Sequence, residues 1–169
     1  MITPALLEKV ELPTEMADDS KVWMYQSSTP IDKNIQIQLE ADLASFSSQW
    51  IAHGQKLQAF TAVYHHQFVC FIVDQSAQGA TGCSIDTSVR FLQQMERKYD
   101  LQFFDRMATA YVDRQGEIQT TLLSKLSALK SAGIIDEETL VFNNTIQTLS
   151  ELRTKWLIPA GQSWHMRFL

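Results

Sequence analysis

The apolar positions of this chain predict an alternation of strands and helices. Apolar residues three or four positions apart over residues 35–50, and again over 85–99, predict two helices that each bury one face. Short runs rich in β-branched and aromatic residues predict strands at 22–25, 57–64, 68–73 and 108–112. Because the run at 68–73 is apolar throughout, we expect a central strand that is buried on both faces.

The C-terminal third predicts three further elements. Apolar residues three or four positions apart over 118–129 predict a third helix, which ends at Gly133. Residues 139–142 are expected to form a short strand. Asn144 or Thr145 is the expected N-cap of a last helix, since both side chains can accept a hydrogen bond from a backbone N–H.

The order of the first six elements decides the expected fold class. Strand, helix, strand, strand, helix, strand is the order of the ferredoxin-like split βαβ arrangement, whose mostly antiparallel sheet carries its helices on one face. We therefore expect an α+β fold with this core and a C-terminal helix–strand–helix extension. A length of 169 residues suits a single domain with a sizeable core, which we place at residues 21–169.

Charge divides the chain into an acidic start and a nearly neutral body. The net charge is −5, and residues 1–20 contribute five carboxylates and one lysine, a net of −4. We therefore expect residues 1–20 to form an extended acidic arm. Lys and Arg nowhere form the basic stripe that neutralises phosphates, so neither nucleic acid nor a membrane surface is expected as a partner.

The cysteines and the apolar stretches indicate a cytoplasmic location. Cys70 and Cys83 are too few for a disulfide framework, and Cys70 lies in an apolar run where we expect it to pack as a small apolar side chain. No apolar run approaches the roughly 20 residues of a membrane span. The first residues also lack the apolar core of a signal peptide.

The segment from Gly79 to Asp86 holds the best candidate for chemistry. It joins a buried strand to a helix, for which Ser84 is the expected N-cap. Backbone N–H groups at a helix start carry partial positive charge, and Gly82 lets another molecule approach closely. A thiol in that position has a lowered pKa, so Cys83 is the candidate nucleophile, with Gly82 and Ser84 as candidate ligand contacts.

A reactive thiol also needs a base. None is close to Cys83 in sequence, although the fold could bring His53 or His165 near it. Asp86 lies in the first helical turn, where its charge opposes a thiolate. The structural alternative is that the glycines make the turn and Cys83 only packs beneath it.

Two other kinds of site are not expected. The chain has no G-x-x-x-x-G-K-[ST] run, so nucleotide hydrolysis of the P-loop type is not expected. His65 and His66 are neighbours that would point to opposite faces of a strand, and no Cys-x-x-Cys pattern is present, so we expect neither a metal nor another cofactor. His53, followed by Gly54, is expected to cap the C-terminal end of the first helix.

The last residues are unusually apolar for a chain end. Leaving a large apolar side chain in water forgoes roughly 1.5–3 kcal/mol of burial free energy. This applies to Trp164, Met166, Phe168 and Leu169. We expect them to pack on their own domain, which needs no partner, or on a second copy of the chain. Trp and Arg are typical interface anchors, so Trp164 and Arg167 are candidate contacts of a homodimer.

Several segments together resemble a known family: Trp50–Gly54, Ala80–Asp86, Val141–Asn144 and Ser163–Phe168. The chain resembles a small family of uncharacterised bacterial proteins that are often labelled "ABC transporter ATPase", and the resemblance covers nearly all of it beyond the first 20 residues. The missing P-loop does not support that label. The resemblance implies that the Cys83 loop, the His53 corner and the Trp164–His165 tail could converge on one pocket.

Two functional hypotheses follow. The first is a binding or interaction protein that could form a homodimer, with a small-molecule ligand that the sequence does not identify. The alternative is a thiol-dependent hydrolase or transferase that uses Cys83 with His53 or His165 as its base.

Overall fold

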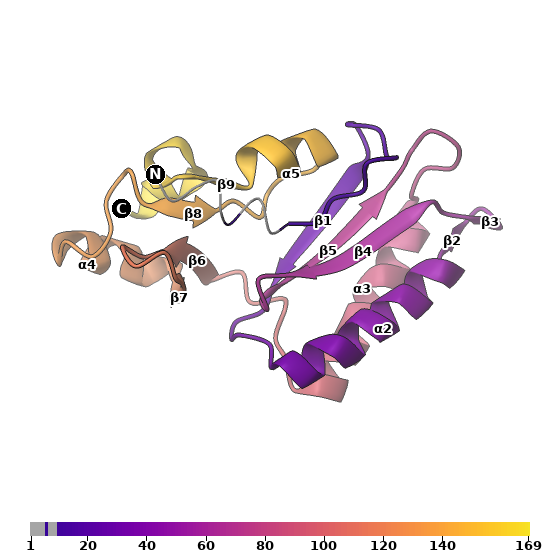
Figure 1. Ribbon diagram of the computed structural model, residues 1–169, viewed down its shortest axis with the longest axis horizontal. Helices are drawn as coiled ribbons and strands as arrows, with labels where there is room; N and C mark the ends of the chain where they lie inside the picture. The colour runs from indigo at the N-terminus through magenta and orange to yellow at the C-terminus, as the bar shows by residue number, and fades with distance from the viewer. Residues whose placement is uncertain (1–5, 7–9) are drawn as a thin grey trace.

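The computed structural model describes residue 6 and residues 10–169, which form two main antiparallel sheets and a small two-stranded one, with helices packed around them (Figure 1). The first sheet has the strand order β1-β5-β4, and its strands are β1 (Lys21–Gln26), β4 (Ala59–Tyr64) and β5 (Phe68–Val73). All residues of β5 are buried, which confirms the predicted central strand.

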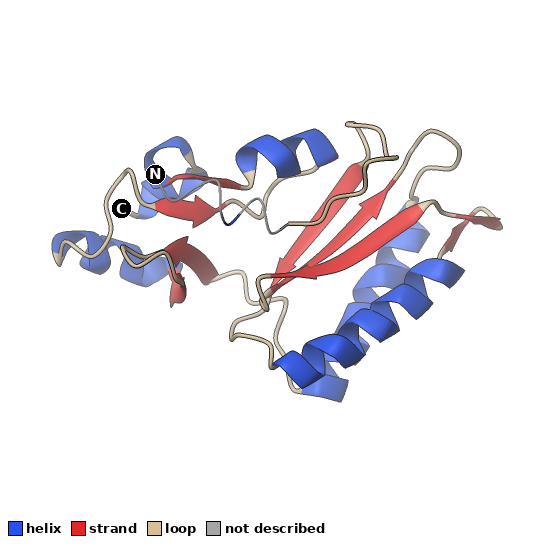
Figure 2. Ribbon diagram, in the orientation of Figure 1, coloured by secondary structure: helices blue, strands red, loops and turns tan. Residues whose placement is uncertain are grey.

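Two long helices cover one face of this sheet (Figure 2). They are α2 (Lys33–Gln49) and α3 (Gly82–Tyr99), as the apolar spacing predicts. Leu39 of α2 and Leu92 of α3 pack with Val69 and Phe71 of β5 in one apolar cluster. An α+β fold with helices on one face of an antiparallel sheet is thus confirmed.

The second sheet has the strand order β7-β6-β8-β9, with strands β6 (Ala108–Val112), β7 (Ile118–Leu122), β8 (Leu140–Phe142) and β9 (Leu157–Pro159). Helix α5 (Leu149–Lys155) packs between the two sheets, because Leu149 and Leu152 share a cluster with Cys70 of β5 and Phe142 of β8. Helix α4 (Leu126–Ser131) and short 3₁₀ turns cover the far face of the second sheet.

The ferredoxin-like detail is not confirmed. β1, α2 and β4 do form a split βαβ unit with β5 inserted between the strands, but β6 does not lie beside β1. It pairs with β7 and β8 instead. Both faces of β6 are buried, Ala110 toward the first sheet and Tyr111 toward α4, and a single helix-covered sheet would leave one face open.

The predicted third helix is wrong over its first half. Residues 118–122 form β7, and only 126–131 are α-helical. The turn before β7 explains the difference: the Asp113 carboxylate accepts hydrogen bonds from the N–H groups of Gln115 and Glu117, and Gly116 has a φ of 87°. This turn starts a hairpin, so the apolar residues that follow pair with β6.

Three predicted cap positions are also wrong. Thr81 rather than Ser84 is the N-cap of α3, and Ser84 completes a capping box as its third residue. Thr148 caps α5, while Asn144 and Thr145 lie in the loop that follows β8. His53 does not cap α2, since that helix ends at Gln49.

His53 and Gly54 have φ values of 49° and 73° and form the turn between the short strands β2 (Ile51–Ala52) and β3 (Gln55–Lys56). Trp50 is the C-cap of the preceding helix, and its side chain is buried in the core, where the indole donates a hydrogen bond to the Ser84 carbonyl at 2.8 Å.

The described part of the acidic arm lies against the domain. Val10, Leu12 and Met16 pack on the cluster that includes α5, and the Tyr64 hydroxyl donates a hydrogen bond to the Glu11 carbonyl at 2.9 Å. The other predicted arm residues, 1–5 and 7–9, lie outside the described residues.

Candidate functional site

The structure places Cys83 and His53 at the surface and His165 in the interior. Cys83 is exposed in the first turn of α3, next to the exposed Gly82, whereas Ser84 is buried under the cap. His53 lies on the exposed β2–β3 turn. Among the described residues, no hydrogen bond joins the Cys83 thiol to either imidazole.

His165 has no free ring nitrogen to offer a thiol. Nε2 lies 2.7 Å from the Thr109 hydroxyl, and Nδ1 lies 2.8 Å from the Ser163 hydroxyl. Burial lowers the pKa of His165 to about 4, so the ring is neutral at pH 7. The side chain is a buried connection between β6 and the C-terminal segment.

The C-terminal residues pack on their own domain. Trp164 stacks on His165 with 3.9 Å between the ring centroids, and Leu169 lies against the cluster that includes α4. For Trp164 and Leu169 the structure has the packing on their own domain, one of the two alternatives expected from the sequence. Met166 and Phe168 remain 42% and 38% exposed, and Arg167 is also exposed.

Trp164 and His165, but neither Cys83 nor His53, line a large cavity between the two sheets. Its volume is about 600 Å³, within the range of small-molecule sites. The lining is mostly apolar and comes from β1, α3, the loop before β6, β6 itself, the segment after β8 and the tail: Met24, Tyr25, Gln26, Val89, Phe103, Phe104, Asp105, Arg106, Ala108, Thr109, Phe142, Asn144, Thr145, Trp164 and His165.

The position of β6 creates this cavity. In a ferredoxin-like sheet the strand after the second helix would lie against β1, whereas here the loop 100–107 carries the chain past that edge. Ala108 and Thr109 of β6 therefore face the edge of β1 across the cavity. On the side of α3, Tyr25 contacts Phe104 edge to face at 5.5 Å, which gives that wall an aromatic surface.

Gln26 lines the cavity and carries an unpaired, buried donor. The residue is 7% exposed, and Nε2 has no hydrogen-bond partner among the described residues. The orientation of this amide follows from its neighbours. The Trp156 indole can only donate and reaches Asn144 Oδ1 at 3.0 Å, so Asn144 Nδ2 donates to Gln26 Oε1 at 3.0 Å. Gln26 Nε2 is then the group without a partner.

The backbone of β1 adds further unpaired groups. The Val22 N–H bonds the Gln147 carbonyl, on the side of β1 that faces away from β5. Backbone groups alternate across a strand, so Met24 and Gln26 present their N–H and C=O to that same side. No partner for these groups is found among the described residues. On the same side of the chain, residues 147–149 cover the start of β1, and the Ser28 N–H just after β1 bonds the Gln102 carbonyl at 2.9 Å, so the free stretch comprises Met24 and Gln26.

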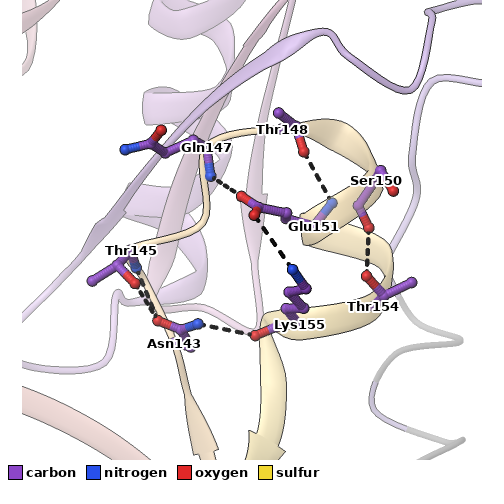
Figure 3. Close-up of polar contacts among 8 residues, drawn as sticks. All are labelled: Asn143, Thr145, Gln147, Thr148, Ser150, Glu151, Thr154 and Lys155. Atoms are coloured by element: carbon purple, nitrogen blue, oxygen red, sulfur yellow. Dashed lines mark hydrogen bonds and ion pairs between the residues drawn. The ribbon is translucent and has the colours of Figure 1, made fainter. Parts of the chain in front are cut away.

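A network of side chains holds residues 143–155 in place (Figure 3). This segment lines the cavity through Asn144 and Thr145, and its residues 147–149 cover the start of β1. Thr148 caps α5 by accepting the Glu151 N–H at 3.2 Å, and Glu151 accepts the Gln147 N–H at 2.8 Å. That backbone hydrogen bond lowers the pKa of Glu151. Asn143 accepts the Thr145 N–H and donates to the Lys155 carbonyl, so this rim is fixed from both ends of α5.

Positive charge gathers beside the cavity. Arg106 lines it and forms no ion pair with a described carboxylate. A second cavity of about 240 Å³ shares Asp105 and Ala108 with the first and is lined by Lys125, which has no described ion pair either. Asp105 is the acidic residue of both linings, and its carboxylate accepts the Met107 N–H at 2.9 Å.

Comparison with protein-family models, with curated proteins and with solved structures finds no match to this chain. The resemblance to bacterial proteins therefore stays a prediction. Over residues 10–169 together with Leu6, no helix has both the length and the apolar character needed to cross a bilayer. Within the same residues, no three His, Cys, Asp or Glu side chains come together in a way that could hold a metal ion.

The residues that build the cavity, apart from Trp164 and His165, were not found by sequence reasoning. Gln26, Phe103 and Arg106 belong to no motif, and their spacing in the chain carries no chemical signal. The sequence predicts Asn144 only as a possible helix cap. Asn144 instead orients Gln26, through a contact that sequence spacing does not show.

Proposed function

We propose that this chain is a binding domain and that the cavity between the two sheets is its ligand site. The ligand has an apolar body and at least one hydrogen-bond acceptor. The observation that carries this proposal concerns Gln26, which lines the cavity. Its Nε2 donor is buried and has no hydrogen-bond partner among the described residues. A buried donor without a partner costs about 1–3 kcal/mol, and an acceptor on a ligand would remove that cost.

The proposal is tested with 8-anilinonaphthalene-1-sulfonate, which combines an aromatic body with acceptor oxygens. Titration of the full chain is followed by fluorescence and by ¹⁵N–¹H spectra. We expect saturable binding at one site that shifts the Gln26 side-chain amide and the Trp164 indole signals.

Gln26→Met keeps the size of the side chain and removes the donor, so it should weaken this binding by about three- to tenfold. Gln38→Met makes the same change on the exposed face of α2 and should leave the binding unchanged. Saturation without shifts at the cavity, equal binding by wild type and Gln26→Met, or no binding by wild type would each refute the proposal.

The thiol-dependent alternative has no comparable support. Among the described residues, neither His53 nor His165 is hydrogen-bonded to Cys83, and Cys83 lines neither cavity described above. A cytoplasmic location remains part of the proposal and is supported by the free state of Cys70 and Cys83.

We also retain the homodimer as a proposal, supported by the exposed Met166 and Phe168 next to Trp164. Light scattering of the full chain should show a dimer that Phe168→Ser weakens, with Ile37→Ser on the exposed face of α2 as the matched control. A strict monomer at every concentration would remove this part of the proposal.

A further inference from the structure

We propose that the occupant of the cavity is an extended peptide segment that adds to the free edge of β1 and carries a carboxylate. This inference rests on the proposed function and names the class of its ligand. It would place an added strand on the side of β1 where a ferredoxin-like sheet has its fourth strand and where this fold has a cavity.

The spacing of the unpaired groups matches an extended chain. Met24 and Gln26 are two residues apart, so their outward N–H and C=O groups repeat with the period at which a neighbouring strand offers its own. Strand addition of this kind gives a peptide its affinity through main-chain hydrogen bonds. A compact small molecule could form hydrogen bonds with one of these residues but would not offer partners to both at this spacing.

The walls on both sides of the β1 edge suit the alternating side chains of an added strand. On the face of Tyr25, the cavity is lined by Val89, Phe103 and Phe104. On the opposite face, which Met24 shares, it is lined by Phe142. Side chains on either face of the peptide would therefore meet apolar surface.

The polar groups specify the rest of the peptide. Gln26 belongs to the same lining, and its buried Nε2 donor has no partner among the described residues. Arg106 lies in the lining, and Lys125 lies in the adjoining cavity, both without a described ion pair. One acidic side chain on the peptide complements this charge, because Asp105 balances only one of the two cations.

The same geometry argues against a second copy of the sheet as the occupant. β6 and residues 103–106 line the same cavity as β1, so the space beside this edge is bounded by other parts of the fold. A single segment needs about 4.8 Å beside β1, whereas a second sheet would need room for several strands.

The experiment selects ligands for the full chain from a phage-displayed library of random linear dodecapeptides. The strongest selected peptide is synthesised, its affinity is measured, and each of its backbone nitrogens is methylated in turn. We expect methylation at alternate residues to weaken binding by about tenfold or more, since those N–H groups face β1, and methylation between them to matter far less.

Hydrogen exchange provides a readout in the protein itself. The Met24 and Gln26 amides should exchange quickly in the free chain and slowly with the peptide bound. The Trp23 and Tyr25 amides, which face β5, should be protected in both states. Arg106→Gln should weaken the peptide and reduce the salt dependence of its affinity, while Arg114→Gln, on the exposed β6–β7 turn, should not.

The other outcomes separate this inference from the proposed function. If the naphthalene probe shifts the cavity residues but no peptide is selected, the ligand is a small molecule and the peptide inference is wrong. Selected peptides that show no alternation, or that leave Met24 and Gln26 unprotected, would also overturn strand addition. If those two amides are already protected in a peptide-free dimer, a second copy is the occupant. If neither probe nor peptide reaches the cavity, both proposals fall.

Discussion

His165 links the C-terminal segment to β6 as a neutral ring, and this neutrality has a consequence for stability. Burial holds its pKa at about 4 in the folded chain, below the usual value near 6.5. The unfolded chain therefore binds more protons than the folded chain between these values. Stability is fully present above about pH 6.5 and is lost as the pH falls toward 4.

This predicts a pH-dependent loss that a variant removes. Between pH 7 and pH 5 the wild type should lose about 1–2 kcal/mol more unfolding free energy than His165→Asn, measured by urea unfolding. Because the two chains share every other titratable group, an identical pH dependence would show that His165 is not held neutral.

The two thiols differ in exposure, which predicts their reactivity. Cys83 is exposed, while Cys70 is fully buried in β5, where burial raises its pKa. In the native protein Ellman's reagent should titrate one thiol, and Cys83→Ser should abolish that reaction. Both thiols of the wild type should react in urea. Fast native labelling of Cys70 would contradict the buried position of β5.

At the scale of elements, the start of α3 shows how local hydrogen bonds decide a boundary. Thr81 and Ser84 each satisfy a backbone N–H of the other. Thr81→Ala should lower the unfolding free energy by about 1 kcal/mol.

The matched control is Thr87→Ala in the same helix, where the hydroxyl only bonds the Cys83 carbonyl one turn earlier. Its effect should stay within about 0.5 kcal/mol. Urea unfolding of both variants measures the difference, and equal effects would mean that the capping box does not hold the helix start.

Elements with one clear period could be predicted from the sequence. α2 and α3 bury one helical face, and β5 is apolar at every position, so the pattern indicates each of them without tertiary information. Residues 118–122 could not be assigned in this way. Ile118 and Leu122 fit a helical spacing of four and also lie on one face of a strand, and the hairpin turn before them decides between the two.

The cavity was beyond prediction for a different reason. Its walls come from segments far apart in the chain, and they meet because β6 leaves the first sheet. The free amide of Gln26 depends on Asn144, which depends in turn on Trp156. No spacing rule connects these three residues, whereas the tail residues were found because their apolar character stands out at a chain end.

At the scale of the whole molecule, the two sheets share one apolar cluster. Phe68, Cys70 and Ile72 of β5 pack with Ala110 of β6 and Leu152 of α5. The sheets should therefore unfold together in one transition.

Leu152→Ala tests this coupling. The side chain is 1% exposed, so its truncation should cost about 2–5 kcal/mol and should shift near-ultraviolet and far-ultraviolet unfolding curves equally. Ile37→Ala, at 58% exposure on α2, should change stability by about 0.5 kcal/mol or less. Separate transitions in Leu152→Ala would show that the two sheets are independent units.

The unpaired edge of β1 also bears on solubility. Bare strand edges invite neighbouring chains to stack onto them, and many proteins blunt such edges with charge, proline or a bulge. Here β6 and residues 103–106 line the cavity beside this edge and limit the access of a second sheet to it. Shortening the loop 103–106 would expose the edge of β1, and the shortened chain would aggregate more readily at high concentration.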